Sequence, residues 1–246
     1  DTARDRRKLF VFLEDNLSGA GREIRIEGFR GALSSEASLD ELTIADDDGV
    51  WFTLRDAVLD WDRAALLRGR VDITRISAAE IIVDRLPQTE TTGPAPEATP
   101  FSLPDLPVSI AIDEIEAERV SLGAPVLRIG TAVDLSVSGA MQLADGSGSA
   151  TLDILRLDGP EGAFNVDVAY ANATEQLDLD LSLTEAEGGL ISGLANIPGS
   201  PDIALTAIGS GPLDAFTTDI TLATRGQDRL TGSIALKAET VEDEGA

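Results

Sequence analysis

The side chains of this chain that could perform acid–base chemistry are mostly carboxylates, because it has 44 acidic residues, no histidine and no cysteine. The missing residue types exclude Ser-His-Asp and Cys-His nucleophiles, histidine general bases, zinc and iron–sulfur sites and disulfides. The only lysines are Lys8 and Lys237, and no G-x-x-x-x-G-K-[ST] phosphate loop occurs, so Schiff-base or P-loop chemistry would have to rest on a terminal segment. We therefore expect no catalytic residues, no enzymatic activity and no cofactor.

Three local patterns remain as candidate sites. Asp46-Asp47-Asp48-Gly49 contains calcium-ligating residue types, but the EF-hand spacing and its distal Glu are absent, so we interpret it as a solvated hairpin turn. Paired carboxylates could catalyse glycoside hydrolysis, but a chain with 44 acidic residues contains such pairs by chance, so their presence does not indicate that activity. Asn172-Ala173-Thr174 fits an N-glycosylation acceptor, a tripeptide that is common by chance. We expect no metal site.

The charge of the chain restricts its partners. Nineteen basic against 44 acidic residues give a net charge of −25, opposite to what binding a phosphate backbone requires, so we exclude nucleic acid as a main partner. No stretch approaches the roughly 18 consecutive apolar residues of a membrane span, and the densest N-terminal run, Leu9 to Leu13, has charges on both sides. The chain begins at Asp1 without a signal-like segment, so we expect an excised or processed piece.

The elements before the linker are predicted from hydrophobic spacing. Residues 4–17 have helical spacing, which predicts a short amphipathic helix within residues 1–21. From residue 22 the period changes to two, and strands are predicted at 39–45 and 50–61, joined by the Asp46 to Gly49 turn. Asp62 as N-cap and Gly69 as C-terminal stop predict a short helix over 62–68, followed by strands at 70–76 and 80–86.

A proline-rich segment follows. Residues 86–107 hold most of the chain's eleven prolines, which cannot donate to a sheet ladder, so we expect a loop over 87–107 that separates 22–86 from 108–246. After it, apolar and polar residues alternate, and Asp145-Gly146, Asp158-Gly159 and Glu187-Gly188 mark turns. The fold class predicted is all-β: about a dozen strands in one long antiparallel meander, too wide to stay a compact flat sheet. A suspected strand bulge lies between Ile154 and Leu155.

The aliphatic face of this sheet needs a cover: another sheet, its own curvature, a partner or lipid. Aromatic residues are only 4% of the chain, and a smooth aliphatic lining suits an acyl chain, which needs dispersion and exclusion of water rather than directional contacts. The composition leaves two interpretations open, a closed β core and a lipid groove.

The residues from Leu9 to Pro87 resemble the TamB family, the inner-membrane component of the translocation and assembly module within the AsmA-like group. The resemblance rests on I-x-G-x-x-G-x-L from Ile26, L-x-x-L-x-I-x-D-x-x-G-x-W from Leu39 to Trp51, L-D-W from Leu59 to Trp61, and strands that lead into Pro87. Leu103 to Gly123 is also typical of that family. The similarity covers nearly the whole chain, more sharply before the linker than after it.

The resemblance implies a long β-sheet curled into a taco-like groove with an aliphatic inside, in the periplasm. It implies bridge-like transfer of phospholipid between the membranes or assistance to outer-membrane protein insertion, with tethering to the inner membrane and to the outer-membrane barrel TamA through parts that this chain lacks. A third interpretation is a passive β-spacer. The predicted lipid-binding residues are Ile24, Ile26, Phe52, Leu54, Val71, Ile73, Leu127, Ile129, Val133, Leu135, Val137, Leu152, Ile154, Phe164, Val166, Val168, Leu177, Leu179, Leu181, Leu183, Ile203, Leu205, Ile220, Leu222, Leu230, Ile234 and Leu236.

Overall fold

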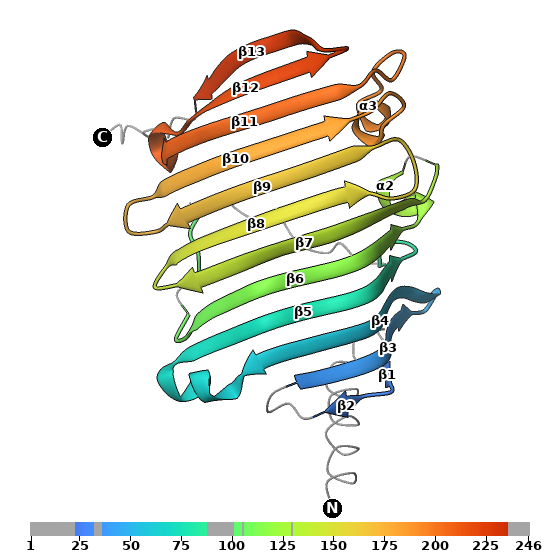
Figure 1. Cartoon of the computed structure of the whole chain (residues 1–246), viewed down its shortest axis with the longest axis vertical. Coiled ribbons are helices and arrows are strands. Elements are labelled where there is room, and N and C mark those ends of the chain that lie inside the picture. The colour runs from blue at the N-terminus through green and yellow to red at the C-terminus, as the bar shows by residue number, and fades with distance from the viewer. Residues whose placement is uncertain (1–22, 32–35, 88–100, 105, 129, 236–246) are drawn as a thin grey trace, which may run out of the picture. The chain divides into compact units, whose positions relative to one another are not determined.

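A computed structural model describes residues 23–31, 36–87, 101–104, 106–128 and 130–235 (Figure 1). The described chain is all-β, as the alternation predicted, with thirteen strands in one sheet and a few short helices. The first strands are β1 (Glu23–Glu27), β2 (Arg30–Gly31), β3 (Glu36–Asp46), β4 (Gly49–Asp62), β5 (Arg70–Val83) and β6 (Ser109–Leu122). They are followed by β7 (Val133–Ala144), β8 (Ser147–Arg156), β9 (Gly162–Ala171), β10 (Gln176–Glu185), β11 (Ile203–Pro212), β12 (Thr217–Thr224) and β13 (Gln227–Ala235).

The strands follow one another in the sheet almost in chain order, from β1 through β3 to β13, and β2 also pairs with β3. This meander confirms the predicted fold class. One neighbour pair departs from the predicted antiparallel arrangement. The Gly123 amide just after β6 donates to the Val83 carbonyl at 2.8 Å, while Arg75 in β5 pairs with Glu116 in β6, so residue numbers rise together and β5 and β6 run parallel.

The parallel pairing of β5 and β6 sets a minimum length for the chain between them. A hairpin joins adjacent ends of antiparallel strands. A parallel pair instead needs a connection of a dozen or more residues, which runs back to the end of the sheet at which the first strand of the pair begins. The chain between Val83 and Ser109 is long enough for such a crossover. The sequence pattern predicted a loop over 87–107, and most of that segment, residues 88–100 and 105, lies outside the described residues.

Local signals placed the short elements correctly. The predicted helix over 62–68 is the 3₁₀ helix η1 (Arg63–Arg68), whose first turn is capped by the Asp62 carboxylate accepting from the Ala64 amide at 2.8 Å. Gly69 ends it in the left-handed conformation with φ 71. Between β7 and β8, Asp145 and Gly146 both have positive φ, 49 and 68, the two-residue turn that suits the twist of a hairpin.

Three local predictions were wrong. Two strands were predicted at 70–76 and 80–86, but residues 70–83 form one strand, β5, and residues 84–86 lie beyond its end. The pairing of β5 with β4 has a register shift between Asp60 and Trp61. Leu127 was predicted as a groove residue of the sheet, but it is the last residue of the short helix α2 (Ala124–Leu127). Pro125 in the first turn favours this helix because its fixed φ is helical. No bulge separates Ile154 from Leu155: exposed and less exposed residues alternate without interruption along β8, and Leu155 lies on the exposed side. The helix predicted at 4–17, Ile129 and Leu236 lie outside the described residues.

The chain forms two compact units. The described parts of Asp1–Pro100, Ala111–Gly139 and Ile154–Gly159 belong to the first, and those of Phe101–Ile110, Ala140–Asp153 and Pro160–Ala246 to the second. The second unit also holds the helix α3 (Leu190–Leu194) and the 3₁₀ turn η2 (Leu213–Ala215). Few large side chains are buried among the described residues. Of their large apolar side chains, only that of Val133 is fully buried.

Candidate functional site

The apolar side chains of the second unit line up across its strands. Phe164 in β9 lies opposite Leu183 in β10, Leu183 opposite Leu205 in β11, Leu205 opposite Leu222 in β12, and Leu222 opposite Leu230 in β13. Because cross-strand partners point to the same side of a sheet, these residues form one row on one face. Five strands therefore contribute one apolar side chain each to a row that runs across them.

Two more rows lie beside the first on the same face. The second row is Val166, Leu181, Ala207, Ile220 and Gly232, and the third is Val168, Leu179, Gly209, Thr218 and Ile234. Adjacent residues on each strand point to the other side, where Asp167, Asp180 and Asp219 lie. The apolar face of the second unit is defined here by these three rows, and most of the predicted groove residues after residue 160 belong to it.

The first unit has an apolar face of its own. Two rows cross its first strands: Ile24, Ile44, Phe52 and Val83, and then Ile26, Leu42, Leu54 and Ile81. Further along, Leu59 lies opposite both Ala37 and Ile76, and Trp61 lies opposite the predicted residue Ile73. The prediction missed Leu42, Ile44, Ile81 and Val83. The alternation of Leu42-Thr43-Ile44 was a signal that could have found the first two, whereas Ile81-Ile82-Val83 is apolar throughout and does not show which side faces the row.

The apolar faces remain partly open to solvent. Among the described residues that were predicted to line the groove, only Val133 and Ile203 are buried, Leu230 and Ile234 are about half exposed (55% and 52%), and the others are intermediate. Side chains in a covered core reach near-complete burial, because a second layer removes water from them. The strands of each unit thus behave as a single layer whose aliphatic side is not fully covered by the described chain.

Both ends of the strands in the second unit are closed by local structure. At one end the buried carboxylate of Glu185 accepts hydrogen bonds from the Ile191 and Ser192 amides, at 2.9 and 3.2 Å, which fixes α3 against the end of β10. At the other end the Phe216 ring is buried against Gly209, where a Cβ would come within 2.7 Å of Cζ of that ring. The Phe216 ring thus lies against the third row at Gly209, and the first and second rows lie between this ring and α3.

The segment Phe101–Leu103 also contacts the apolar side of the second unit. The Phe101 ring packs edge-on against Tyr170 with centroids 5.1 Å apart, and the Leu103 amide donates to Oδ1 of Asn172 at 2.8 Å. The Leu103 side chain lies over Gly148, where a Cβ would come within 3.1 Å of its Cδ1. Sequence reasoning assigned this segment to the proline-rich loop and missed it, because nothing local to a Phe-Ser-Leu sequence signals where it packs.

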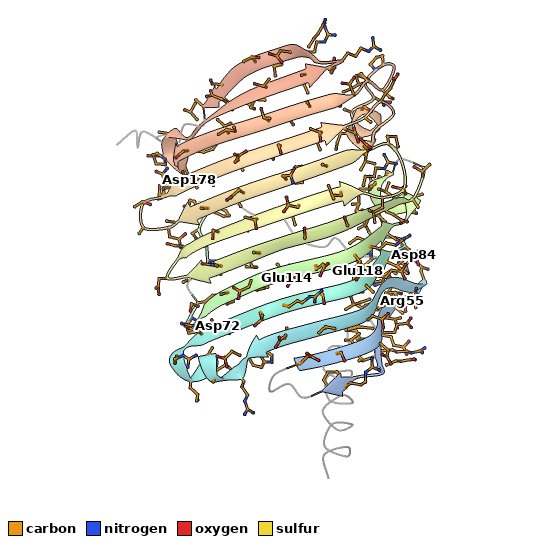
Figure 2. All side chains as sticks on the ribbon, in the orientation of Figure 1. Arg55, Asp72, Asp84, Glu114, Glu118 and Asp178 are labelled. Atoms are coloured by element: carbon orange, nitrogen blue, oxygen red, sulfur yellow. The ribbon has the colours of Figure 1, made fainter. Side chains whose placement is uncertain are left out.

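The polar face of the first unit is neutralised by ion pairs. Arg55 donates to Glu41 at 3.1 Å and to Glu80 at 2.6 Å, joining three strands, and these hydrogen bonds raise the pKa of its guanidinium. Arg75 pairs in the same way with Glu116 and Glu114. Figure 2 shows Arg55 and Glu114 on their strands. The arginines of this unit offset much of its acidic charge.

The polar face of the second unit lacks such pairing, since every ion pair found among the described residues lies in the first unit. Its carboxylates accept from neutral groups instead: Asp178 from the Ser210 hydroxyl and Asp219 from the Ser233 hydroxyl, both at 2.5 Å. Asp167 lies directly opposite Asp180 across β9 and β10. This face is therefore anionic, with Ile208 as an exposed apolar residue between Asp180 and Asp219.

A shallow hollow of about 400 Å³ lies on this polar face. It forms where the small side chains of Ser149, Ala169 and Ala171 leave space, and Gln142, Gln176 and Asp178 contribute polar groups to its lining. Asp178 is labelled in Figure 2 on β10. The hollow is on the opposite side of the strands from the aliphatic rows, so it is not part of the predicted lipid groove.

The Asp46 to Gly49 segment forms the β3–β4 turn. The Asp48 amide donates to Asp46 Oδ1 at 3.0 Å, and Arg85 donates to the Asp46 carboxylate and to the Gly49 carbonyl. A guanidinium already supplies the positive charge that this carboxylate requires, which favours the turn interpretation over a cation site. No group of three or more potential metal ligands is arranged for a metal ion among the residues that the structure describes.

None of the described helices is both long and apolar enough to cross a membrane. The comparisons with known proteins do not identify a relative: no family model, no curated protein and no solved structure matches this chain.

Proposed function

We propose that this protein binds phospholipid acyl chains along its apolar faces and moves lipid between membranes as part of a bridge. The single observation that carries the proposal is the set of continuous aliphatic rows, such as Phe164, Leu183, Leu205, Leu222 and Leu230, that lie across successive strands on a face left partly open. The opposite face is polar, so lipid contact is confined to one side.

A lipid acyl chain can slide along an apolar surface that makes no specific polar contacts with it, and the apolar rows provide such a surface. Burying an acyl chain of about sixteen carbons is worth roughly 13 kcal/mol at ~0.8 kcal/mol per CH₂ group, and losing this burial is the main barrier to crossing water. Most row positions hold Leu, Val, Ile or Phe, so an acyl chain would meet similar contacts from strand to strand and could advance without leaving the surface. The exceptions are Ala207, Gly209, Thr218 and Gly232. The headgroup stays in solvent beyond the aliphatic rows.

The resemblance of residues 9–87 to the TamB family supports the same proposal and adds its context. On this proposal the protein acts in the periplasm, is tethered to the inner membrane, and meets the outer-membrane barrel TamA through parts outside this chain. The chemistry of the faces supplies no direction for transport. Direction must come from the donor and acceptor membranes or from another component.

The test is organic extraction and lipid mass spectrometry of the purified protein, beside a β-sandwich of similar size prepared from the same cells. We expect phospholipid at about one or more molecules per chain, because the aliphatic rows would otherwise face water. Lipid no higher than in the sandwich control would contradict lipid binding, and would leave the passive spacer and the alternative below as the remaining interpretations.

A second candidate function is capture of an extended strand from a client outer-membrane protein. It is favoured by β13, the last strand of the sheet order, whose nine residues are all exposed and whose outer side has no neighbouring strand among the described residues. An edge strand offers unpaired backbone amides and carbonyls that a client strand can extend. Proline replacing Thr231 or Ser233 should weaken client binding in this case, whereas charges within the aliphatic rows should not.

A further inference from the structure

The segment Phe101–Leu103 is held on the apolar side of the second unit by one side chain above all. Asn172 Oδ1 accepts from the Leu103 amide and Asn172 Nδ2 donates to the Leu103 carbonyl, both at 2.8 Å. The Tyr170 hydroxyl adds a long bond of 3.4 Å to the Phe101 carbonyl. A single amide group therefore satisfies both backbone polar groups of Leu103, in the way that a neighbouring strand would.

The Leu103 side chain takes a place that belongs to the apolar face. Gly148 lies on the less exposed side of β8 together with Leu152 and Ile154, and its missing Cβ makes room for Cδ1 of Leu103 beside Leu143. An aliphatic group thus lies on the aliphatic side of the strands, as an acyl chain would. Any acyl chain that reaches this end of the face must compete with Leu103 for the same surface.

The attachment is local and shallow. Phe101 is 63% exposed, Ser102 and Pro104 are exposed, and Leu103 is only half-buried, whereas Tyr170 beneath them is 6% exposed. Releasing the segment would uncover Tyr170, Leu143 and Gly148 while disturbing no strand pairing. We propose that Phe101–Leu103 is a displaceable cover, locked by Asn172, whose place on the apolar side is taken by an incoming acyl chain. The identity of the incoming group rests on the proposed function.

The chain provides a selective reporter for this cover, because Tyr170 is its only tyrosine. Incorporation of 3-fluorotyrosine gives one ¹⁹F resonance, located under the Phe101 ring. Hydrogen exchange of the 101–104 peptide reports the Leu103 amide independently. The variant Asn172→Ala removes both hydrogen bonds to Leu103. Asn165→Ala is the matched control, since Asn165 lies on β9, the strand that Asn172 directly follows, but donates to Asp153 on the polar face.

We expect Asn172→Ala to shift the fluorine resonance toward its position in the unfolded protein and to accelerate exchange at Leu103 roughly tenfold, the effect of losing two neutral hydrogen bonds. Dihexanoyl-phosphatidylcholine, added below its micelle concentration, should shift the wild-type resonance in the same direction and should bind Asn172→Ala several-fold more tightly. Asn165→Ala should behave like the wild type. Leu103→Ala, which keeps the backbone bonds, should also bind the phospholipid more tightly.

The possible outcomes test the proposed cover separately from the proposed lipid binding. Saturable phospholipid binding that leaves the resonance and the Leu103 exchange unchanged overturns the cover and leaves lipid binding in place. An unchanged resonance and exchange in folded Asn172→Ala also overturn it, because Asn172 would then not be the lock. No phospholipid binding by the wild type or either cover variant overturns both the proposed function and the acyl competition.

Discussion

Arg85, just beyond the end of β5, donates through Nη1 to Oδ2 of Asp46 at 2.8 Å, although the two residues are 39 positions apart in the chain. Its side chain is 24% exposed and that of Asp46 is 10% exposed, so this is the most enclosed ion pair of the β3–β4 turn region. The pKa of the Arg85 guanidinium is raised by its hydrogen bond to Asp46, which keeps the cation charged at any working pH. The pair thus joins the β3 end of the β3–β4 turn to the end of β5, and β4 lies between these two strands in the sheet.

We expect Arg85→Ala to lower the free energy of unfolding several times more than the exposed control Arg68→Ala, because it removes the guanidinium that pairs with the Asp46 carboxylate and donates to the Gly49 carbonyl. Arg68→Ala is the control. It breaks an ion pair to Asp62 in which both side chains are more than half exposed, and should cost about 0.5 kcal/mol or less. Urea unfolding followed by the fluorescence of Trp51 and Trp61 measures both, since both tryptophans lie in the first unit. Equal losses would contradict the role given to Arg85.

Acid should weaken the first unit through Asp158. Burial acts to raise the pKa of this carboxyl, but hydrogen bonds from Arg156 and from backbone groups outweigh it, so its pKa lies below the ordinary value of 3.8. A carboxyl with a depressed pKa contributes stability above its unfolded pKa and loses that contribution as the pH falls through its folded pKa. The stability difference between the wild type and Asp158→Asn should therefore be constant from pH 7 to pH 5 and shrink below about pH 4. Urea titrations at those pH values measure it, and a constant difference down to pH 2.5 would contradict the prediction.

Two glycines on the apolar face of the second unit should respond differently to the same substitution. In Gly209→Ala the new Cβ would lie 2.6 Å from the Thr217 carbonyl oxygen and 2.7 Å from the Phe216 ring, so we expect a loss of about 2 kcal/mol or more. In Gly232→Ala the new Cβ would meet nothing within 4 Å, so the change should be neutral or slightly stabilising. Thermal unfolding followed by circular dichroism compares the two. Similar melting temperatures for both variants would show that Phe216 does not depend on the space at Gly209.

The opposed carboxylates Asp167 and Asp180 should repel each other. Like charges directly across an antiparallel pair are destabilising, so Asp167→Asn should raise the stability by about 0.5 kcal/mol at low salt. The gain should vanish at about 1 M salt, where the Debye length falls to roughly 3 Å. Asp153→Asn is the control, because Asp153 accepts a hydrogen bond from Asn165 and removing its charge should bring no gain. A gain that persists at high salt would indicate a cause other than charge repulsion.

Charge placed on the two sides of β10 should separate the roles of its faces. Leu181→Asp puts a carboxylate in the second apolar row, between Val166 and Ala207, and should remove most of the retained phospholipid. Thr184→Asp puts the same group on the exposed, polar side of the same strand and should leave the lipid content unchanged. Lipid mass spectrometry of both purified proteins, with circular dichroism to verify folding, measures the contrast. Equal lipid loss in both variants would contradict binding on the apolar face.

The sequence alone determined the features that depend on neighbouring residues. The period of two in Leu177, Leu179, Leu181 and Leu183 requires a strand with one apolar side, since successive side chains point to opposite faces. Asp62 and Gly69 bound a short helix because capping acts within a few residues, and Asp145-Gly146 forms a tight turn because both residues tolerate positive φ. For the same reason most predicted groove residues are on one face of their strands.

The tertiary structure decided which strands and segments meet. Strand direction depends on hydrogen bonds between distant residues, so the parallel pairing of β5 and β6 could not be predicted from the alternation, which is the same for parallel and antiparallel neighbours. Leu103 illustrates the same limit, because its position depends on Asn172, 69 residues away, and on a missing Cβ at Gly148. Local pattern specifies which side of a strand is apolar, whereas long-range pairing alone specifies what that side contacts.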